Sequence, residues 1–257
     1  MKRRDFAKTM AGAMGGLVLS RGGLFGAVAA PGLGLSDPVL QPKFQELVPN
    51  ALHPAFKFRQ RGRSYYDVAI REIGNHVTGL VDSMGRKLTT PVWGYGERRG
   101  RGATWPGRTF EVRSASAPGS TPTTTVRWSN ELYGVPGHLL PVDTHLHWCY
   151  SLPGYNENSI EVEGIPIITH LHGGNTNFQY DGNPEFFYSP GGVVRGPQWS
   201  NVDGGFTDEF VYNNDVPAGN LWYHDHALGI TRLNVYAGLA GFYFVRDQFD
   251  TGRPDNP

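Results

Sequence analysis

Short apolar or alternating runs recur along the chain from residue 64 onward, and Gly, Pro, Asn or Asp residues separate them. Runs of this length, rich in Val, Thr, Tyr and Phe, are typical of β-strands. The pattern predicts strands at 64–73, 91–95, 108–113, 123–128, 165–172, 206–212, 221–226 and 238–245. Short strands joined by turn residues predict an all-β fold, a Greek-key sandwich or barrel.

The segments between and around these strands lack a period. Residues 133–164 and 181–205 are long stretches of this kind, and loops of such length are usually functional or wrapped on the surface. Residues 31–63 are Pro-rich and polar, which predicts an N-terminal extended arm ahead of a domain at 64–248. Residues 249–257 are polar and contain Pro, and we expect them to be a linker to a following domain.

The first thirty residues have the features of a twin-arginine signal peptide. Arg3 and Arg4 precede a weakly apolar stretch, and small residues at 27–30 fit a cleavage site. Neither apolar run approaches the roughly 20 residues that a membrane-spanning helix needs. We therefore expect no membrane span, export through the twin-arginine route, and a periplasmic or extracellular location for the mature chain.

Charge and cysteine content exclude two classes of protein. The formal net charge is +0, and past the N-terminus there is no long basic run, so a nucleic-acid partner is not expected. The one cysteine, Cys149, excludes an internal disulfide framework.

Histidines supply the candidate chemistry, because six of the 9 form His-x-His pairs. His170 and His172 end one apolar run, and His224 and His226 end another. Period 2 places both imidazoles of a pair on one face, about 7 Å apart, so each pair favours a polynuclear cluster over a single ion. Four neutral imidazoles suit copper or zinc. The other interpretation of such a pair is two hydrogen-bonded histidines without a metal.

Three further residues are candidates for supporting the metal site without binding the metal. Asp225 is the odd residue of its pair, so we expect it to support the ligands while pointing away from the metals. His145 and His147 form the third pair, in a long loop after Asp143. Metal-dependent amidohydrolases begin with the same Asp-x-His-x-His motif, but their fold is a (β/α) barrel. The hydrophobic pattern of this chain does not predict the amphipathic helices of such a barrel. We expect His145 and His147 to support the metal site from outside or to be polar loop residues, and a zinc hydrolase is a weaker hypothesis.

Four ordered motifs resemble those of multicopper oxidases, especially bacterial spore-coat laccases and bilirubin oxidases. They lie at 104–112, 169–174, 221–227 and 231–239, and the similarity runs from about residue 64 to 247. The resemblance implies a cupredoxin-like (plastocyanin-like) N-terminal domain of such an enzyme.

The resemblance also implies the copper ligands. His170 would bind the type 2 copper, and His172, His224 and His226 the type 3 pair. In the family this cluster reduces dioxygen to water with electrons that a reducing substrate delivers through a type 1 copper. The remaining cluster histidines and the type 1 His-Cys-His segment belong to the family's last domain and have no counterpart in this sequence, since Cys149 is followed by Tyr150.

We therefore expect an oxidoreductase domain that is incomplete and inactive alone, with the remaining cupredoxin domains supplied in cis or in trans. The alternative is a non-catalytic exported cupredoxin module that buffers or delivers copper. The sequence does not identify the reducing substrate.

Overall fold

The computed structural model describes residues 37–62, 64–117 and 123–253. The chain divides into two compact units, residues 1–41 and 42–257. In the first unit the described residues form a turn, closed by a hydrogen bond of 3.1 Å from Leu40 N to Asp37 O. The predicted signal peptide, residues 1–30, lies outside the described residues. The rest of the fold belongs to the second unit.

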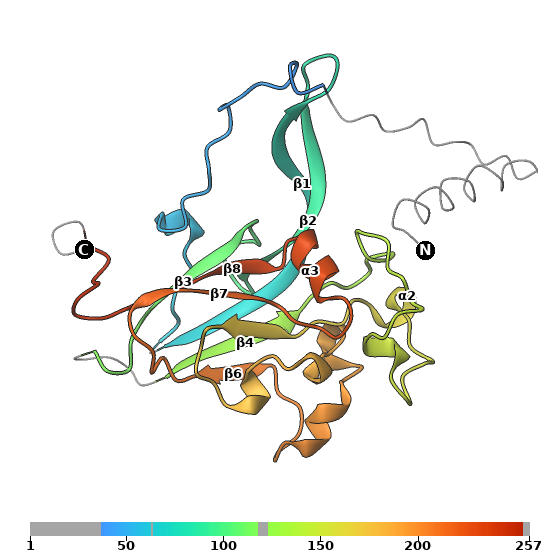
Figure 1. The fold of residues 1–257 in the computed structure, drawn as a ribbon, viewed down its shortest axis with the longest axis vertical. Helices are drawn as coiled ribbons and strands as arrows, with labels where there is room; N and C mark the ends of the chain where they lie inside the picture. Colours follow the sequence, from blue (N-terminus) through green and yellow to red (C-terminus); the bar gives the residue numbers. More distant parts are fainter. Residues whose placement is uncertain (1–36, 63, 118–122, 254–257) are drawn as a thin grey trace, which may run out of the picture. The chain divides into compact units, whose positions relative to one another are not determined.

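The strands of the second unit form two mixed sheets (Figure 1). Strands β1 and β4 pair in parallel, as do β3 and β8, and the other neighbours are antiparallel. The first sheet has the order β2 (Lys87–Glu97), β1 (Tyr65–Val81), β4 (Thr124–Asn130) and β6 (Glu209–Tyr212). The second has the order β3 (Gly107–Arg113), β8 (Ala240–Arg246), β7 (Gly219–Asp225) and β5 (Thr169–His172). The predicted all-β class is confirmed.

Aromatic side chains fill the space between the two sheets. Trp128 of the first sheet lies 5.3 Å from Tyr223 of the second, measured between ring centroids. Phe110 lies 5.2 Å from Tyr223, and Tyr95 lies 4.9 Å from it. All four side chains are buried. Because Tyr223 faces this core, strand alternation directs Trp222 and His224 to the opposite face of β7.

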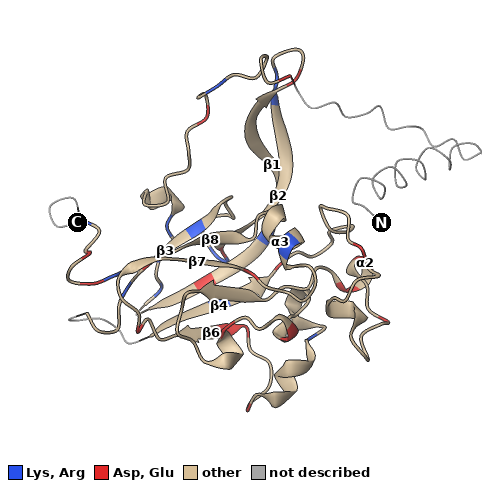
Figure 2. Ribbon diagram, viewed as in Figure 1, with Lys and Arg blue, Asp and Glu red and all other residues tan. Residues whose placement is uncertain are grey.

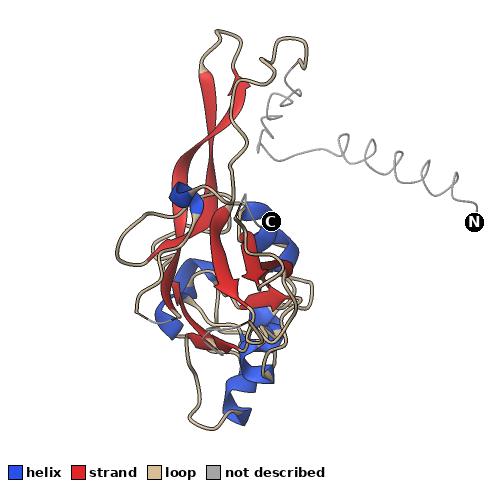
Figure 3. Cartoon of the chain, turned by 90° about the vertical axis from the view of Figure 1, so that its left-hand side faces the viewer, coloured by secondary structure: helices blue, strands red, loops and turns tan. Residues whose placement is uncertain are grey.

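Each predicted strand overlaps an observed one, but several bounds differ. β1 continues to Val81 and β2 begins at Lys87, so the two strands form a hairpin that extends past the sandwich (Figures 1 and 3). The extension was missed because its residues are mostly polar and exposed. β5 is shorter than predicted, because Ile167 pairs with Tyr188 and not with β7.

The helices are short (Figure 3), and most lie in the stretches predicted as long loops. These stretches bury Trp148, Tyr150, Phe187 and Trp199, so they form part of the core. Among the described residues, no helix has the length and apolar character that crossing a membrane requires. Within the described part of the chain the helices are η1 (Pro54–Phe56), η2 (Cys149–Ser151), α2 (Ile160–Glu163), η3 (Phe178–Tyr180), η4 (Pro184–Phe186), η5 (Pro190–Gly192), η6 (Pro197–Asn201) and α3 (Thr231–Ala237).

The inner end of the predicted arm is attached to β3. Phe58 N donates to Thr109 O over 3.0 Å, and the Phe58 ring lies 4.4 Å from that of Phe110. Residues 42–55 are mostly exposed. The boundaries of the arm, the domain and the linker remain predictions.

Positive and negative residues are interspersed along the described chain, without a large region of one sign (Figure 2). Arg71 pairs with Glu131 at 2.6 Å, and Arg246 pairs with Glu111 at 3.0 Å. Partly exposed pairs of this kind each contribute about 0–1 kcal/mol. They balance charge locally and add little to the stability of the sandwich.

Candidate metal centre

The β5–β7 ladder sets the two histidine pairs against each other. In the antiparallel register His170 lies opposite His224, and His172 lies opposite Trp222. Leu171 alternates to the core side and is buried. The imidazoles of the two strands therefore share the outer face of this ladder.

The ring nitrogens converge. One nitrogen from each of His170, His172 and His224 lies within 4.8 Å of the others. His172 Nδ1 and His224 Nε2 are 3.3 Å apart. Two nitrogens bound tetrahedrally to one ion at about 2 Å also lie about 3.3 Å apart, so this spacing fits a shared metal.

His226 completes the group from just beyond β7. Its backbone N donates to Ile168 O over 2.8 Å, which holds the residue beside the start of β5. Its ring lies 5.1 Å from that of His170 and 5.7 Å from that of His224. The structure thus brings all four predicted ligands together.

Backbone carbonyls fix the tautomers of three of these rings. His224 Nδ1 lies 2.6 Å from Asp225 O, and His226 Nδ1 lies 2.9 Å from Gly182 O. His170 Nδ1 makes the same kind of bond with Asp181 O. A carbonyl oxygen only accepts, so in each ring Nδ1 carries the proton and Nε2 presents its lone pair.

Burial keeps two of these imidazoles neutral at physiological pH. It lowers the pKa of His224 to about 4, with the neighbouring histidines acting in the same direction. It also lowers the pKa of His170. Neutral imidazole is the form that binds a metal, so His170 and His224 need no deprotonation at neutral pH.

The loop after β5 supplies contacts that the sequence analysis missed. Asp181 Oδ1 accepts from Thr176 Oγ1 at 2.8 Å and lies 3.4 Å from His170 Nδ1. Gly182 offers the carbonyl for His226. In the sequence, the pair Asp181-Gly182 could have indicated these contacts, because it is a common turn sequence and follows the first histidine pair closely.

Gly182→Ala is expected to destabilise the fold around β5. Gly182 has φ +75°, and an added Cβ would lie 2.6 Å from His170 Cα and 2.7 Å from Thr169 O. Both atoms belong to backbone, so the loop or the strand must shift. We expect a loss of about 2–4 kcal/mol in the free energy of unfolding, measured by urea titration.

Gly204→Ala is the matched control for this change. Gly204 has φ +86° with nothing within 4 Å of an added Cβ, so it carries the backbone strain without the collision. Equal losses of stability in the two variants would contradict the predicted collision.

Asp225 points into the interior, in the direction that strand alternation predicts. Its carboxylate accepts from Ile168 N at 3.1 Å, from Ala227 N at 3.0 Å and from Asn234 Nδ2 at 2.8 Å. The side chain is buried, and burial raises its pKa to about 7.

The third histidine pair is not part of the converging group of ring nitrogens. His145 and His147 are exposed, and His145 Nδ1 lies 3.2 Å from Asp143 Oδ1. Among the residues that the structure describes, the converging group of metal-ligating side chains is the one formed by His170, His172 and His224. Cys149 is buried, and its thiol donates to Leu228 O over 3.3 Å.

An apolar groove borders the cluster. Its volume is about 880 Å³, and its lining includes Trp105, Trp222, His224, Val235 and Tyr236. The Trp222 ring lies 4.2 Å from that of His224, so this aromatic wall contacts one of the candidate ligands directly.

Curated relatives of the chain are laccases and multicopper oxidases. A laccase of Bacillus subtilis (strain 168) is 31% identical over 201 residues, which span 78% of this chain and 32% of that protein. A laccase of Haloferax volcanii is 31% identical over 214 residues, spanning 82% of this chain and 31% of that protein. Multicopper oxidase LPR1 of Arabidopsis thaliana is 36% identical over 157 residues, spanning 61% of this chain and 23% of that protein.

Among solved structures, a laccase from Pediococcus acidilactici Pa5930 aligns with TM-score 0.46 and 19% identity, covering 77% of this chain and 30% of that one. No family model matches the sequence.

The chain is a β-sandwich in which four histidines gather at the ends of two strands of one sheet, and the relatives named above are oxidoreductases of one class. The chain belongs to the multicopper oxidase family. It spans about a third or less of the length of these curated relatives. Membership of this family implies copper as the metal.

Proposed function

We propose that the chain is the N-terminal copper-binding domain of a laccase-like multicopper oxidase. The observation that carries the proposal is the convergence of two His-x-His pairs across the β5–β7 ladder. In this proposal His170 holds the type 2 copper, and His172, His224 and His226 hold the type 3 pair. Further cupredoxin domains, in cis or in trans, supply the other ligands and the type 1 centre.

The donor set fits copper. It consists of imidazole nitrogens, three of which are held in one tautomer by backbone carbonyls. When bound, copper supplies the one-electron chemistry by which the complete enzyme would reduce dioxygen at the expense of a reducing substrate. The residues of this chain orient the nitrogens and keep His170 and His224 neutral.

The open side of the cluster supports a role for further domains. His172 is exposed, and the groove beside His224 presents Trp222 and Tyr236 at 38% and 79% exposure. Exposed apolar surface of this kind marks a place where another protein surface packs. We further propose export by the twin-arginine route, on the basis of Arg3 and Arg4.

The copper-loaded chain is expected to bind metal without oxidase activity. Copper(II) titrated into the purified chain should give an electron paramagnetic resonance signal with nitrogen hyperfine structure. No intense blue thiolate band should appear, because Cys149 is buried and burial raises the pKa of its thiol. Oxygen uptake with a phenolic substrate should stay at the level of free copper.

Two results would contradict this expectation. Binding of zinc but not copper, shown by metal analysis, would remove the proposed function. Steady oxidation of the phenol by the chain alone, lost in His224→Ala, would show that the chain is a complete oxidase.

A further inference from the structure

We propose that Asn234 and Asp225 are positioning residues that set the tautomer and orientation of His224. The inference deepens the proposed function, because it concerns how the chain prepares one of its copper ligands. It starts from a chain of hydrogen bonds that runs from the half-buried His138 through Asn234 to Asp225. Asn234 is 0% exposed and Asp225 1%.

The first step is the anchoring of Asp225. Its carboxylate receives three donors from three segments: Ile168 N, Ala227 N and the Asn234 side chain. Ile168 precedes β5, Ala227 follows β7, and Asn234 belongs to α3. One side chain therefore joins the backbones that carry both histidine pairs to the helix behind them.

The second step passes from the Asp225 side chain to His224. The carbonyl of Asp225 accepts from His224 Nδ1 over 2.6 Å. The peptide that carries this carbonyl is held on one side by the bond from His226 N to Ile168 O and on the other by the three donors to the Asp225 carboxylate. Anchoring the side chain of Asp225 thus helps to orient the carbonyl that keeps the proton on Nδ1 and leaves Nε2 of His224 for the metal.

The third step fixes Asn234 itself. Its Nδ2 donates to Asp225 Oδ1 and also to Pro166 O over 3.1 Å. Its Oδ1 faces His138 Nε2 at 3.0 Å. Both sides of the amide are used, so the orientation that presents Nδ2 to Asp225 is the one that satisfies every partner.

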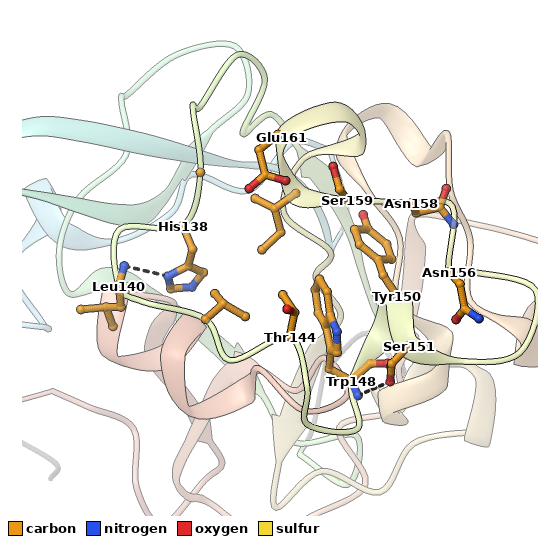
Figure 4. Close-up of a pocket in the computed structure, with 13 residues that line it drawn as sticks. His138, Leu140, Thr144, Trp148, Tyr150, Ser151, Asn156, Asn158, Ser159 and Glu161 are labelled. Atoms are coloured by element: carbon orange, nitrogen blue, oxygen red, sulfur yellow. Dashed lines mark hydrogen bonds between the residues drawn. The ribbon is translucent and has the colours of Figure 1, made fainter. Parts of the chain in front are cut away.

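The direction of the last bond follows from the other nitrogen of His138. His138 Nδ1 accepts from Leu140 N over 2.9 Å (Figure 4). The ring proton therefore sits on Nε2 and is donated to Asn234. His138 lines a cavity of about 600 Å³ together with Trp148 and Glu161 (Figure 4). The loop of residues 133–164 is thereby connected to the candidate ligand strand.

The test is Asn234→Ala in the full chain, compared with Asn130→Ala. Asn130 is a matched control because it is also buried and donates to two backbone carbonyls, Ile165 O at 2.8 Å and Tyr188 O at 3.2 Å. Proton–nitrogen correlation spectra of the metal-free chain should show His224 as a single Nδ1–H tautomer in the parent and in Asn130→Ala. In Asn234→Ala a mixture of tautomers is expected.

Copper titration provides the second readout. Loss of an outer partner of a metal ligand lowers metal affinity about 10- to 100-fold, and we expect this loss in Asn234→Ala but not in Asn130→Ala. The copper(II) resonance spectrum should change in the same variant only. A parent-like tautomer, affinity and spectrum in Asn234→Ala would overturn the inference.

Two provisions keep the result decisive. If Asn234→Ala does not fold, Asn234→Asp keeps the shape of the side chain and removes its donor to Asp225 Oδ1, and a parent-like His224 tautomer there would overturn the inference. If the parent binds no copper, the proposed function fails, while the tautomer spectra of the metal-free chain still decide this inference.

Discussion

His224→Ala is expected to abolish copper binding at the strand-end cluster. His224 is the most buried of the four histidines, and its Nε2 lies 3.3 Å from His172 Nδ1. Its ring also contacts those of His170 and His226 at centroid distances of 5.4 and 5.7 Å. Removing the shared neighbour of three candidate ligands should cost more than the about 10- to 100-fold loss that follows removal of an outer partner.

Isothermal titration of copper(II) into the folded variant measures this loss, and His145→Ala is its control. His145 carries the same imidazole, but its side chain is 96% exposed on the loop after Asp143. We expect the control to bind like the parent. Unchanged affinity in His224→Ala, or an equal loss in both variants, would show that copper binds elsewhere on the chain.

The period-2 alternation of apolar residues was enough to predict the approximate positions of the strands. It also predicted that the two histidines of each His-x-His pair share one face of their strand. Near the ends of β5 and β7 the alternate positions hold His170, His172, Trp222 and His224, and Leu171 and Tyr223 between them are buried. Alternation is a local property of a strand, so it can be read without knowing its neighbours. The convergence of the two pairs also needed the register of β5 on β7, which the sequence does not contain.

The contacts that hold the histidines could not be predicted in this way. Asn234 and His138 act through a bond between segments that lie 96 positions apart in the sequence. Asp181 lies close to His170 in the sequence, but its contact with His170 depends on the path of the loop between them. Buried aromatics of the long loops, such as Phe186 and Trp199, follow no period because these loops wind around the core in short turns. Tertiary packing decides their burial, and local propensity does not.

Trp128→Ala is expected to be among the most destabilising single changes in the chain. The side chain is 1% exposed, lies between the two sheets, and donates from Nε1 to Tyr212 Oη over 3.0 Å. Truncation leaves a cavity against Tyr223 and removes that hydrogen bond. Buried Trp→Ala changes cost about 3–5 kcal/mol, which is a large part of the total stability of a domain.

Loss of the Trp128 ring should also disturb the position of His224, because Tyr223 packs against Trp128 and precedes His224 on β7. We therefore expect Trp128→Ala both to lower the urea midpoint and to weaken copper binding under conditions where the chain is still folded. Trp105→Ala, at a ring that is 40% exposed, is the control for loss of a tryptophan and should change the midpoint far less. A Trp128→Ala chain with the parent's midpoint would mean that the two sheets do not pack through this ring.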